Sequence, residues 1–252
     1  HKAPVVRLHS TGKEVDFSPI EFAMNGDYES ITLGGVVGFA NGLYNHMLVA
    51  CNSNPPTICR FNIETGEALP GTTINFNAGQ PDTIRAFTTD RAGNMYILER
   101  NSARWFLLSP TGEYFENMPY GDAQTRASDI AVLKNGAMVF LTNRTNDVIE
   151  SWHGATEVGR SQYWQAPDFI SSTRGVSKMF VDENDHIFIC NSQYGFISEY
   201  DRIGTLVGHI TGKHLSMTAP QALAFPPNSS RLYITEVIGD GPGRVKVWKK
   251  MQ

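Results

Sequence analysis

The run Met95-Tyr96-Ile97-Leu98-Glu99 decides the fold, because runs of the same strongly apolar kind return along the chain. They are Met47-Leu48-Val49-Ala50-Cys51, Met138-Val139-Phe140-Leu141-Thr142, Ile187-Phe188-Ile189-Cys190-Asn191 and Leu232-Tyr233-Ile234-Thr235-Glu236. The first residues of successive runs are 48, 43, 49 and 45 positions apart. Short runs rich in β-branched and aromatic residues are typical of buried strands. The chain therefore repeats one strand-containing unit about every 45 residues.

The segments around each run keep the same order in every repeat. A turn rich in Gly, Asn and Asp precedes the run, at residues 40–42, 90–94, 134–136, 182–185 and 227–229. A polar loop follows the run and leads to a third strand, expected at residues 58–61, 105–108, 148–152, 196–200 and 245–248. No stretch of 12 residues shows the 3.6-residue apolar period of a helix, so we expect an all-β chain.

A repeat of this length built only from strands predicts a β-propeller whose units are four-stranded blades. Five complete units are visible, and residues 19–24 are expected to begin a sixth blade; six blades are favoured, with five as the alternative. Residues 5–9 and 14–17 read as a third and a fourth strand, whereas the last unit stops after its third strand. We therefore expect strands from both termini to close the ring, which removes exposed sheet edges.

Composition places the chain among globular proteins. It has 252 residues, of which 41% are hydrophobic and 18% charged, and a formal net charge of −4. This length suits one all-β domain over residues 1–252, and no apolar run is long enough to span a membrane. The mildly acidic balance argues against a general polyanion binder. Because the chain begins at His1, we expect it to be part of a longer protein.

Cysteine usage bears on the compartment. The three cysteines, Cys51, Cys59 and Cys190, form no C-x-x-C pair, and an odd number leaves at least one thiol unpaired. We interpret them as small buried hydrophobic residues in a reducing compartment, and therefore expect a cytoplasmic protein.

Two segments resemble NHL repeats. They are Phe87-Thr88-Thr89-Asp90-Arg91-Ala92-Gly93-Asn94-Met95-Tyr96-Ile97 and the stretch from Phe180-Val181-Asp182-Glu183-Asn184-Asp185 to Glu199-Tyr200-Asp201. The chain departs from the family pattern at Asn52, Asn101, Asn143 and Asn191, near the places where the family usually keeps Asp. The resemblance implies a propeller, most often six-bladed, of the kind found at the C-terminus of tripartite-motif (TRIM-NHL) proteins. There it acts as a recognition module for RNA or protein, although other NHL-like propellers are enzymes, notably the amidating lyases.

Motifs of known catalytic and metal sites are absent from the sequence. His46 and His186 stand at matching places before or at the start of second strands, and we interpret them as structural or solvated. Residues 182–185 are oxygen-rich like a calcium loop but lack its Gly and distant Glu, so a polar turn is expected. We therefore expect no catalytic residue, no metal and no cofactor. The alternative kept open is a metal-dependent hydrolase or lyase that uses the central channel.

Polar loops after the second strands, with the loops that lead into the first strands, form the candidate binding face. They combine arginine, amide and aromatic side chains, which pair with phosphate, bond base edges and stack on bases in single-stranded RNA. The candidate residues are Arg100, Asn101, Arg104, Arg126, Asn143, Arg144, Arg174, Gln193 and Tyr194. Carboxylates such as Glu99 and Asp129 share this face, and Asn and Ser also serve turns without any ligand.

The leading hypothesis is a non-enzymatic domain that binds single-stranded RNA on this face. The alternative is a protein-interaction platform on the same face. In either case we expect the isolated domain to be a monomer that does not contact a membrane.

Overall fold

β-Strands make up every regular element that the computed structural model of the chain describes. The described residues are 36–41, 46–51, 56–62, 74–75, 84–99, 104–119, 127–142, 148–152, 160–165, 176–192, 194–211, 217–225, 231–236 and 244–249. Within these ranges, no helix has the length and apolar character needed to cross a membrane.

The strands follow the order that the repeat predicts. In chain order they are β1 (Val36–Asn41), β2 (His46–Cys51), β3 (Thr57–Asn62), β4 (Ile74–Asn75), β5 (Ile84–Thr89), β6 (Met95–Glu99), β7 (Arg104–Leu108), β8 (Tyr114–Pro119), β9 (Ala127–Val132), β10 (Met138–Thr142), β11 (Val148–Trp152), β12 (Arg160–Gln165), β13 (Val176–Val181), β14 (Ile187–Asn191), β15 (Phe196–Tyr200), β16 (Leu206–Thr211), β17 (Pro220–Ala224), β18 (Arg231–Glu236) and β19 (Arg244–Lys249). The predicted second and third strands of all five units are confirmed, within a residue at each end.

Each repeat forms one antiparallel sheet in which the strands pair in chain order. Four sheets have four strands, β1–β4, β5–β8, β9–β12 and β13–β16, and β17–β19 form a sheet of three. The chain forms two compact units, His1–Arg126 with the first two sheets and Ala127–Gln252 with the other three. A single domain over residues 1–252 therefore stays a prediction.

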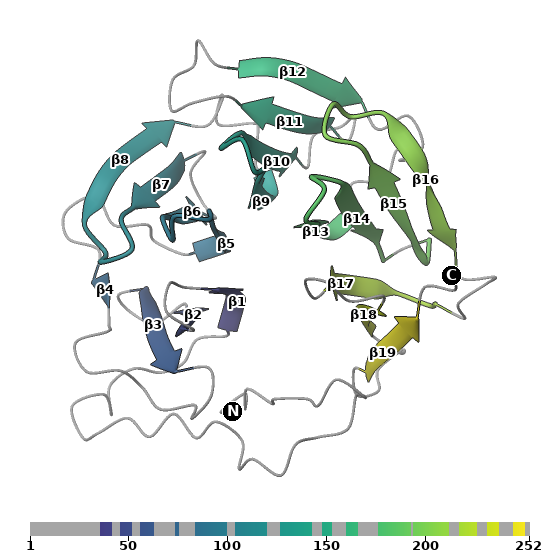
Figure 1. Cartoon of the computed structure of the whole chain (residues 1–252), viewed down its shortest axis with the longest axis horizontal. Coiled ribbons are helices and arrows are strands. Elements are labelled where there is room, and N and C mark those ends of the chain that lie inside the picture. The colour runs from purple at the N-terminus through teal and green to yellow at the C-terminus, as the bar shows by residue number, and fades with distance from the viewer. Residues whose placement is uncertain are drawn as a thin grey trace. The chain divides into compact units, whose positions relative to one another are not determined.

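Within each unit, the first strands of neighbouring sheets lie side by side. In the first unit β1 contacts β5, and in the second unit β13 contacts both β9 and β17 (Figure 1). Every one of these first strands has a register irregularity near its start, for example between Ile84 and Ala86 of β5. Such bulges bend and twist a strand locally. Because every first strand has one, the structural repeat extends to the first strand of each sheet as well as to its turns.

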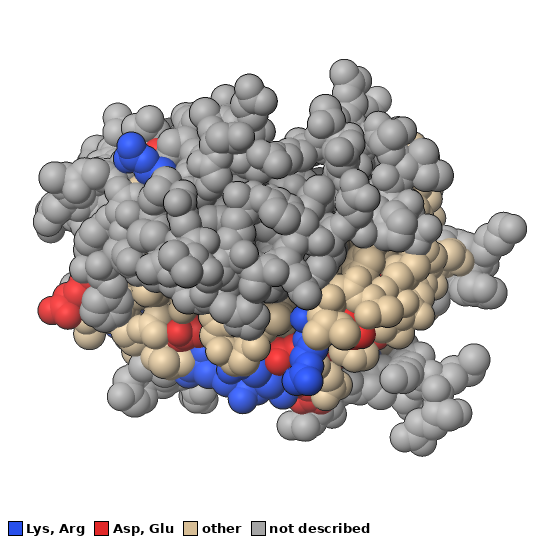
Figure 2. All heavy atoms as spheres, turned by 90° about the horizontal axis from the view of Figure 1, so that it is seen from above, with Lys and Arg blue, Asp and Glu red and all other residues tan. Residues whose placement is uncertain are grey.

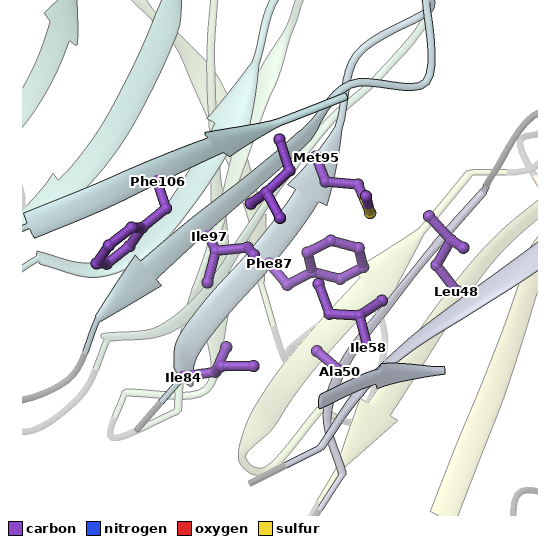
Figure 3. Close-up of a cluster of buried hydrophobic side chains, with 9 residues drawn as sticks. Leu48, Ala50, Ile58, Ile84, Phe87, Met95, Ile97 and Phe106 are labelled. Atoms are coloured by element: carbon purple, nitrogen blue, oxygen red, sulfur yellow. The ribbon is translucent and has the colours of Figure 1, made fainter. Parts of the chain in front are cut away.

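The core of the first unit lies between its two sheets (Figure 3). Strand residues two apart face the same side, so positions 48 and 50, 95 and 97, and 106 and 108 each place a pair of side chains in the cluster. The cluster consists of Leu48, Ala50, Ile58, Ile84, Phe87, Met95, Ile97, Phe106 and Leu108. The Arg60 guanidinium of β3 also donates to the Pro110 carbonyl oxygen after β7, which links the two sheets at the surface.

Two clusters form the core of the second unit, one on each side of the sheet β13–β16. Ile187 and Ile189 of β14 pack with Leu133, beside β9. Phe188 and Cys190 of the same strand pack on the opposite side with residues of β17 and β18, such as Ile234. β14 is buried at all five positions, and the four before Asn191 are apolar, because the strand is covered on both faces.

Turns between first and second strands share one geometry. The N–H groups of Gly93, Gly136 and Asp185 each donate to the carbonyl oxygen three residues earlier, and all three residues have positive φ. Glycine adopts this conformation without strain, whereas aspartate does not. Asp185 compensates with a contact to the neighbouring turn, because its Oδ1 accepts a hydrogen bond of 2.8 Å from the N–H of Lys134. The polar turn expected at residues 182–185 is confirmed.

Among the described residues, the last sheet has the three strands β17–β19. The strands expected at residues 5–9, 14–17 and 19–24 lie outside the described residues. Six blades, five blades and ring closure by both termini therefore stay predictions.

Candidate functional site

The loop end of each sheet is the end at which the second strand finishes and the first and third strands begin. Sheet pairing places Glu99 opposite Ile84 at this end of the second sheet, and Glu236 opposite Pro220 and Arg244 in the last one. Glu99, Asn191 and Glu236 close their second strands here and are all buried. The repeat therefore brings a buried polar side chain to the same end of three sheets.

Of the nine candidate residues, two lie in the described part of the chain, and both are at a loop end. Arg104 is the first residue of β7 and is exposed. Tyr194 lies just before β15 and is 47% exposed. They belong to different units, Arg104 to the first and Tyr194 to the second. The other seven, Arg100, Asn101, Arg126, Asn143, Arg144, Arg174 and Gln193, lie outside the described residues.

Tyr194 is held at the surface by its own turn. Asn191 Oδ1 accepts a hydrogen bond of 3.1 Å from the N–H of Tyr194, and the Asn191 carbonyl oxygen accepts one of 3.0 Å from Gly195. Gly195 has φ +68°, and a Cβ there would lie 2.9 Å from the carbonyl oxygen of Thr218. The turn can approach the segment before β17 this closely only because it has glycine at this position. The Tyr194 ring stacks on that of Phe196, with centroids 6.4 Å apart.

The Glu236 carboxylate contacts both Thr218, in the segment before β17, and the side chains of β19. Its Oε1 accepts a hydrogen bond of 3.2 Å from the N–H of Thr218, and its Oε2 lies 2.8 Å from Arg244 Nε and 3.1 Å from Lys246 Nζ. Burial alone would raise the pKa of this carboxyl, but the hydrogen bonds from Arg244, Lys246 and Thr218 hold it below its ordinary value. Glu236 is therefore an ionised carboxylate that anchors the loop end of the last sheet.

Asp129 plays a comparable part between β9 and β13. Its Oδ2 accepts a hydrogen bond of 2.7 Å from the N–H of Met179, and its Oδ1 lies 3.3 Å from Lys178 Nζ. Burial raises the pKa of this carboxyl, while Lys178 and the N–H of Met179 oppose the rise. Burial, with a smaller contribution from the charge of Asp129, also raises the pKa of the Cys190 thiol. Cys59 and Cys190 are buried, in agreement with the interpretation of the cysteines as core residues.

From the sequence alone, Asp129 is expected only as a carboxylate that shares the candidate face, and no role is expected for Glu236. A signal for Glu236 was present, because the repeated apolar runs of β6, β14 and β18 each end on Glu or Asn. No comparable signal marks Asp129, since its partners Lys178 and Met179 lie about fifty positions away in the chain.

Metal-ligating side chains do not gather in the described part of the chain, where no group of three or more His, Cys, Asp or Glu is placed to hold an ion. His186 Nδ1 lies 2.6 Å from Glu199 Oε1, a pair across β14 and β15. These two side chains supply at most two ligands, whereas a zinc site takes three or four from the protein.

Charges of both signs alternate on the described surface. In Figure 2 the Lys and Arg atoms of the described residues are interspersed with Asp and Glu atoms. Lys178, Arg244 and Lys246 lie against Asp129 or Glu236, so the described cations near this end of the second unit are largely neutralised.

No protein-family model matches the chain, and no curated protein matches it. Solved structures do. A streptogramin B lyase is similar over 87% of this chain and 70% of its own, with TM-score 0.61 and 15% identity. Virginiamycin B lyase from Staphylococcus aureus is similar over 96% and 75%, with TM-score 0.60 and 14% identity. The β-propeller domain of Cps50 (Swd1) from Myceliophteria thermophila is similar over 81% and 62%, with TM-score 0.55 and 9% identity.

The fold is a β-propeller. The four four-stranded sheets and the three-stranded sheet are its described blades, and β1, β5, β9, β13 and β17 are their first strands. At these low identities the similarity establishes the fold and not an activity. The propeller prediction is confirmed, whereas the resemblance to the NHL family stays a prediction.

Proposed function

We propose that this propeller is a non-enzymatic recognition domain whose loop end binds single-stranded RNA. The observation that carries the proposal is Tyr194, whose ring is 47% exposed and is held outward by a turn with glycine at its closest approach. A large aromatic side chain normally buries its ring, so an outward ring on a fixed turn is suited to stacking on a ligand. Bases of single strands stack on such rings.

Arginine side chains are the proposed phosphate contacts. Arg104, a candidate from the sequence, is exposed at a loop end of the first unit. Arg244, which is not among the nine candidates, lies in the second unit, where 41% of its side chain is exposed while its Nε donates to Glu236. In this proposal Arg100, Arg126, Arg144 and Arg174 contribute further phosphate contacts, and Asn101, Asn143 and Gln193 contact base edges. Guanidinium groups suit phosphate because they donate two parallel hydrogen bonds.

A protein partner is the second candidate, and the charges favour it. The buried carboxylates of Asp129 and Glu236 neutralise the cations beside them, which weakens attraction to a polyanion. Exposed Tyr and Arg side chains are also frequent anchors in protein interfaces. Membership of the NHL family, a place in a longer TRIM-NHL protein, a cytoplasmic location and a monomeric state belong to the proposal. A bound divalent metal found by elemental analysis would instead support a hydrolase or lyase.

Fluorescence polarisation with a randomised pool of single-stranded RNA, at two salt concentrations, tests the proposal. If each of the six arginines of the proposed site contacts a phosphate, log K should fall with log salt at a slope of about −4. Arg126→Glu combined with Arg174→Glu should abolish binding and leave the far-ultraviolet circular dichroism unchanged. Unchanged affinity in this double variant would contradict the proposed arginine site. No binding by the native chain at low salt would contradict RNA binding and favour the protein partner.

A further inference from the structure

Three aromatic rings form a continuous row on the fourth blade, β13–β16. Tyr194 stacks on Phe196 with an interplanar angle of 25°, and Phe196 meets His209 edge-on with centroids 5.2 Å apart. Tyr194 and His209, the two ends of the row, are exposed, while Phe196 in the middle is half-buried. We call these three residues the aromatic row.

Strand pairing fixes the row in place. Phe196 begins β15 and pairs with Thr211, and Ser198, two positions further on, pairs with His209 of β16. Residues two apart lie on one face, so Phe196 and Ser198 share the side on which His209 lies. The Ser198 hydroxyl and His209 Nδ1 are 3.1 Å apart, which orients the imidazole beside the Phe196 ring.

The aromatic row is not required by the blade design. The third strands of the five described sheets begin with Thr57, Arg104, Val148, Phe196 and Arg244, so β15 alone begins with an aromatic residue. The core clusters on both sides of this blade include other residues of β15, Ile197 and Tyr200, but not Phe196. The aromatic row is therefore separate from the two core clusters that the described residues of this unit form.

A cation lies at the Tyr194 end of the row. Gly195 approaches Thr218 closely, the N–H of Thr218 donates to Glu236, and Glu236 accepts from Arg244. This chain of contacts places the part-exposed Arg244 guanidinium at the loop end that also carries Tyr194. Rings and an exposed guanidinium at one loop end complement a ligand that alternates planar bases with phosphates.

We infer that the aromatic row is a stacking platform for successive unpaired bases, which carries a bound strand from the loop end onto the side of the fourth blade. This inference rests on the proposed RNA function and adds Phe196 and His209 to the site. Stacking uses the π-face that all bases share, so the row should be tolerant of sequence and selective for single strands.

Equilibrium binding of labelled 15-nucleotide oligo(U), oligo(A) and a 15-base-pair RNA duplex to the whole chain tests the inference. Tyr194→Ala and His209→Ala should each weaken single-strand binding about 5- to 150-fold, while Tyr194→Phe, which keeps the ring, should bind like the native chain. Val207→Ala is the matched control, because Val207 is exposed on β16 outside the row. The two oligonucleotides should bind within about tenfold of each other, and the duplex more weakly than either.

The outcomes separate this inference from the function on which it rests. If the native chain binds single strands and both alanine variants bind equally well, the platform is wrong and the RNA function stands. Tight duplex binding would also overturn the platform. No binding by the native chain would overturn the RNA function and the platform together. Circular dichroism of each variant shows that lost binding does not reflect lost folding.

Discussion

Asp185 offers a sharp test of how the turns hold neighbouring blades. It occupies the turn position that glycine holds at Gly93 and Gly136, with φ +63°, and its Oδ1 accepts a 2.8 Å hydrogen bond from the N–H of Lys134. A non-glycine residue in this conformation costs about 1 kcal/mol. A hydrogen bond to a carboxylate contributes about 1.5–3 kcal/mol. The contact should therefore outweigh the strain.

Three substitutions separate the two contributions. Asp185→Gly removes the strain and the contact, so it should lower the free energy of unfolding by about 1–2 kcal/mol. Asp185→Ala keeps the strain and loses the contact, so it should cost about 1 kcal/mol more than the glycine variant. Asp185→Asn keeps a carbonyl acceptor and tolerates positive φ, so it should cost less than about 1 kcal/mol. Equilibrium unfolding in urea measures all three.

Gly136→Ala is the control for strain alone. Gly136 has φ +81°, and a Cβ added there meets no atom within 4 Å, so its cost should be the conformational one of about 1 kcal/mol. An Asp185→Gly variant as stable as the native chain would refute the proposed contact. Equal stability of the glycine and alanine variants would refute the strain.

Three further changes test the loop end. Glu236→Gln should remove a stabilisation that is present at neutral pH. The lowered pKa of Glu236 favours its ionised form in the folded state, so this stabilisation is lost as the pH falls through that lowered pKa. Urea unfolding at pH 7 and pH 3.5 should therefore show a smaller difference in the free energy of unfolding between variant and native chain at the lower pH. Asp129→Ala should lower the free energy of unfolding by about 2–3 kcal/mol, because it leaves the N–H of Met179 without its acceptor. If thermal unfolding shows a loss below about 0.5 kcal/mol, Asp129 does not have that role. Gly195→Ala should lower the free energy of unfolding by about 2 kcal/mol, because its Cβ would meet the carbonyl oxygen of Thr218. The same change should weaken RNA binding. Unchanged stability and affinity would show that the turn can move away from Thr218.

The blades were predictable from local pattern, and the contacts between blades were not. Met95–Glu99 is a strand from its own composition, and the Gly, Asn and Asp turns lie where the chain must reverse. The contact between Glu236 and Thr218 could not be predicted in this way. Thr218 is 18 positions earlier in the chain and becomes a neighbour of Glu236 only after β17 and β18 pair. The sequence indicates only a polar turn residue at Asp185, because its stabilising hydrogen bond comes from the N–H of Lys134 in another blade.

The aromatic row also depends on contacts between strands that the local sequence does not show. The polar loop after β14 makes Tyr194 a candidate, whereas no pattern in the sequence singles out Phe196 or His209. The register between β15 and β16 places the three rings side by side, and that register comes from hydrogen bonding between strands that the sequence pattern does not specify.

Strand β14 divides its side chains between two different cores, Ile187 and Ile189 on one side and Phe188 and Cys190 on the other. The blade β13–β16 therefore has no interior of its own, and its solubility depends on the neighbour at each face. If one whole repeat were lost or duplicated, the two blade faces that then meet would still be faces of the same kind. A shift of β14 by a single position would put every side chain in the wrong core. Lineages of this chain should thus change length by entire repeats far more readily than by one residue within a second strand.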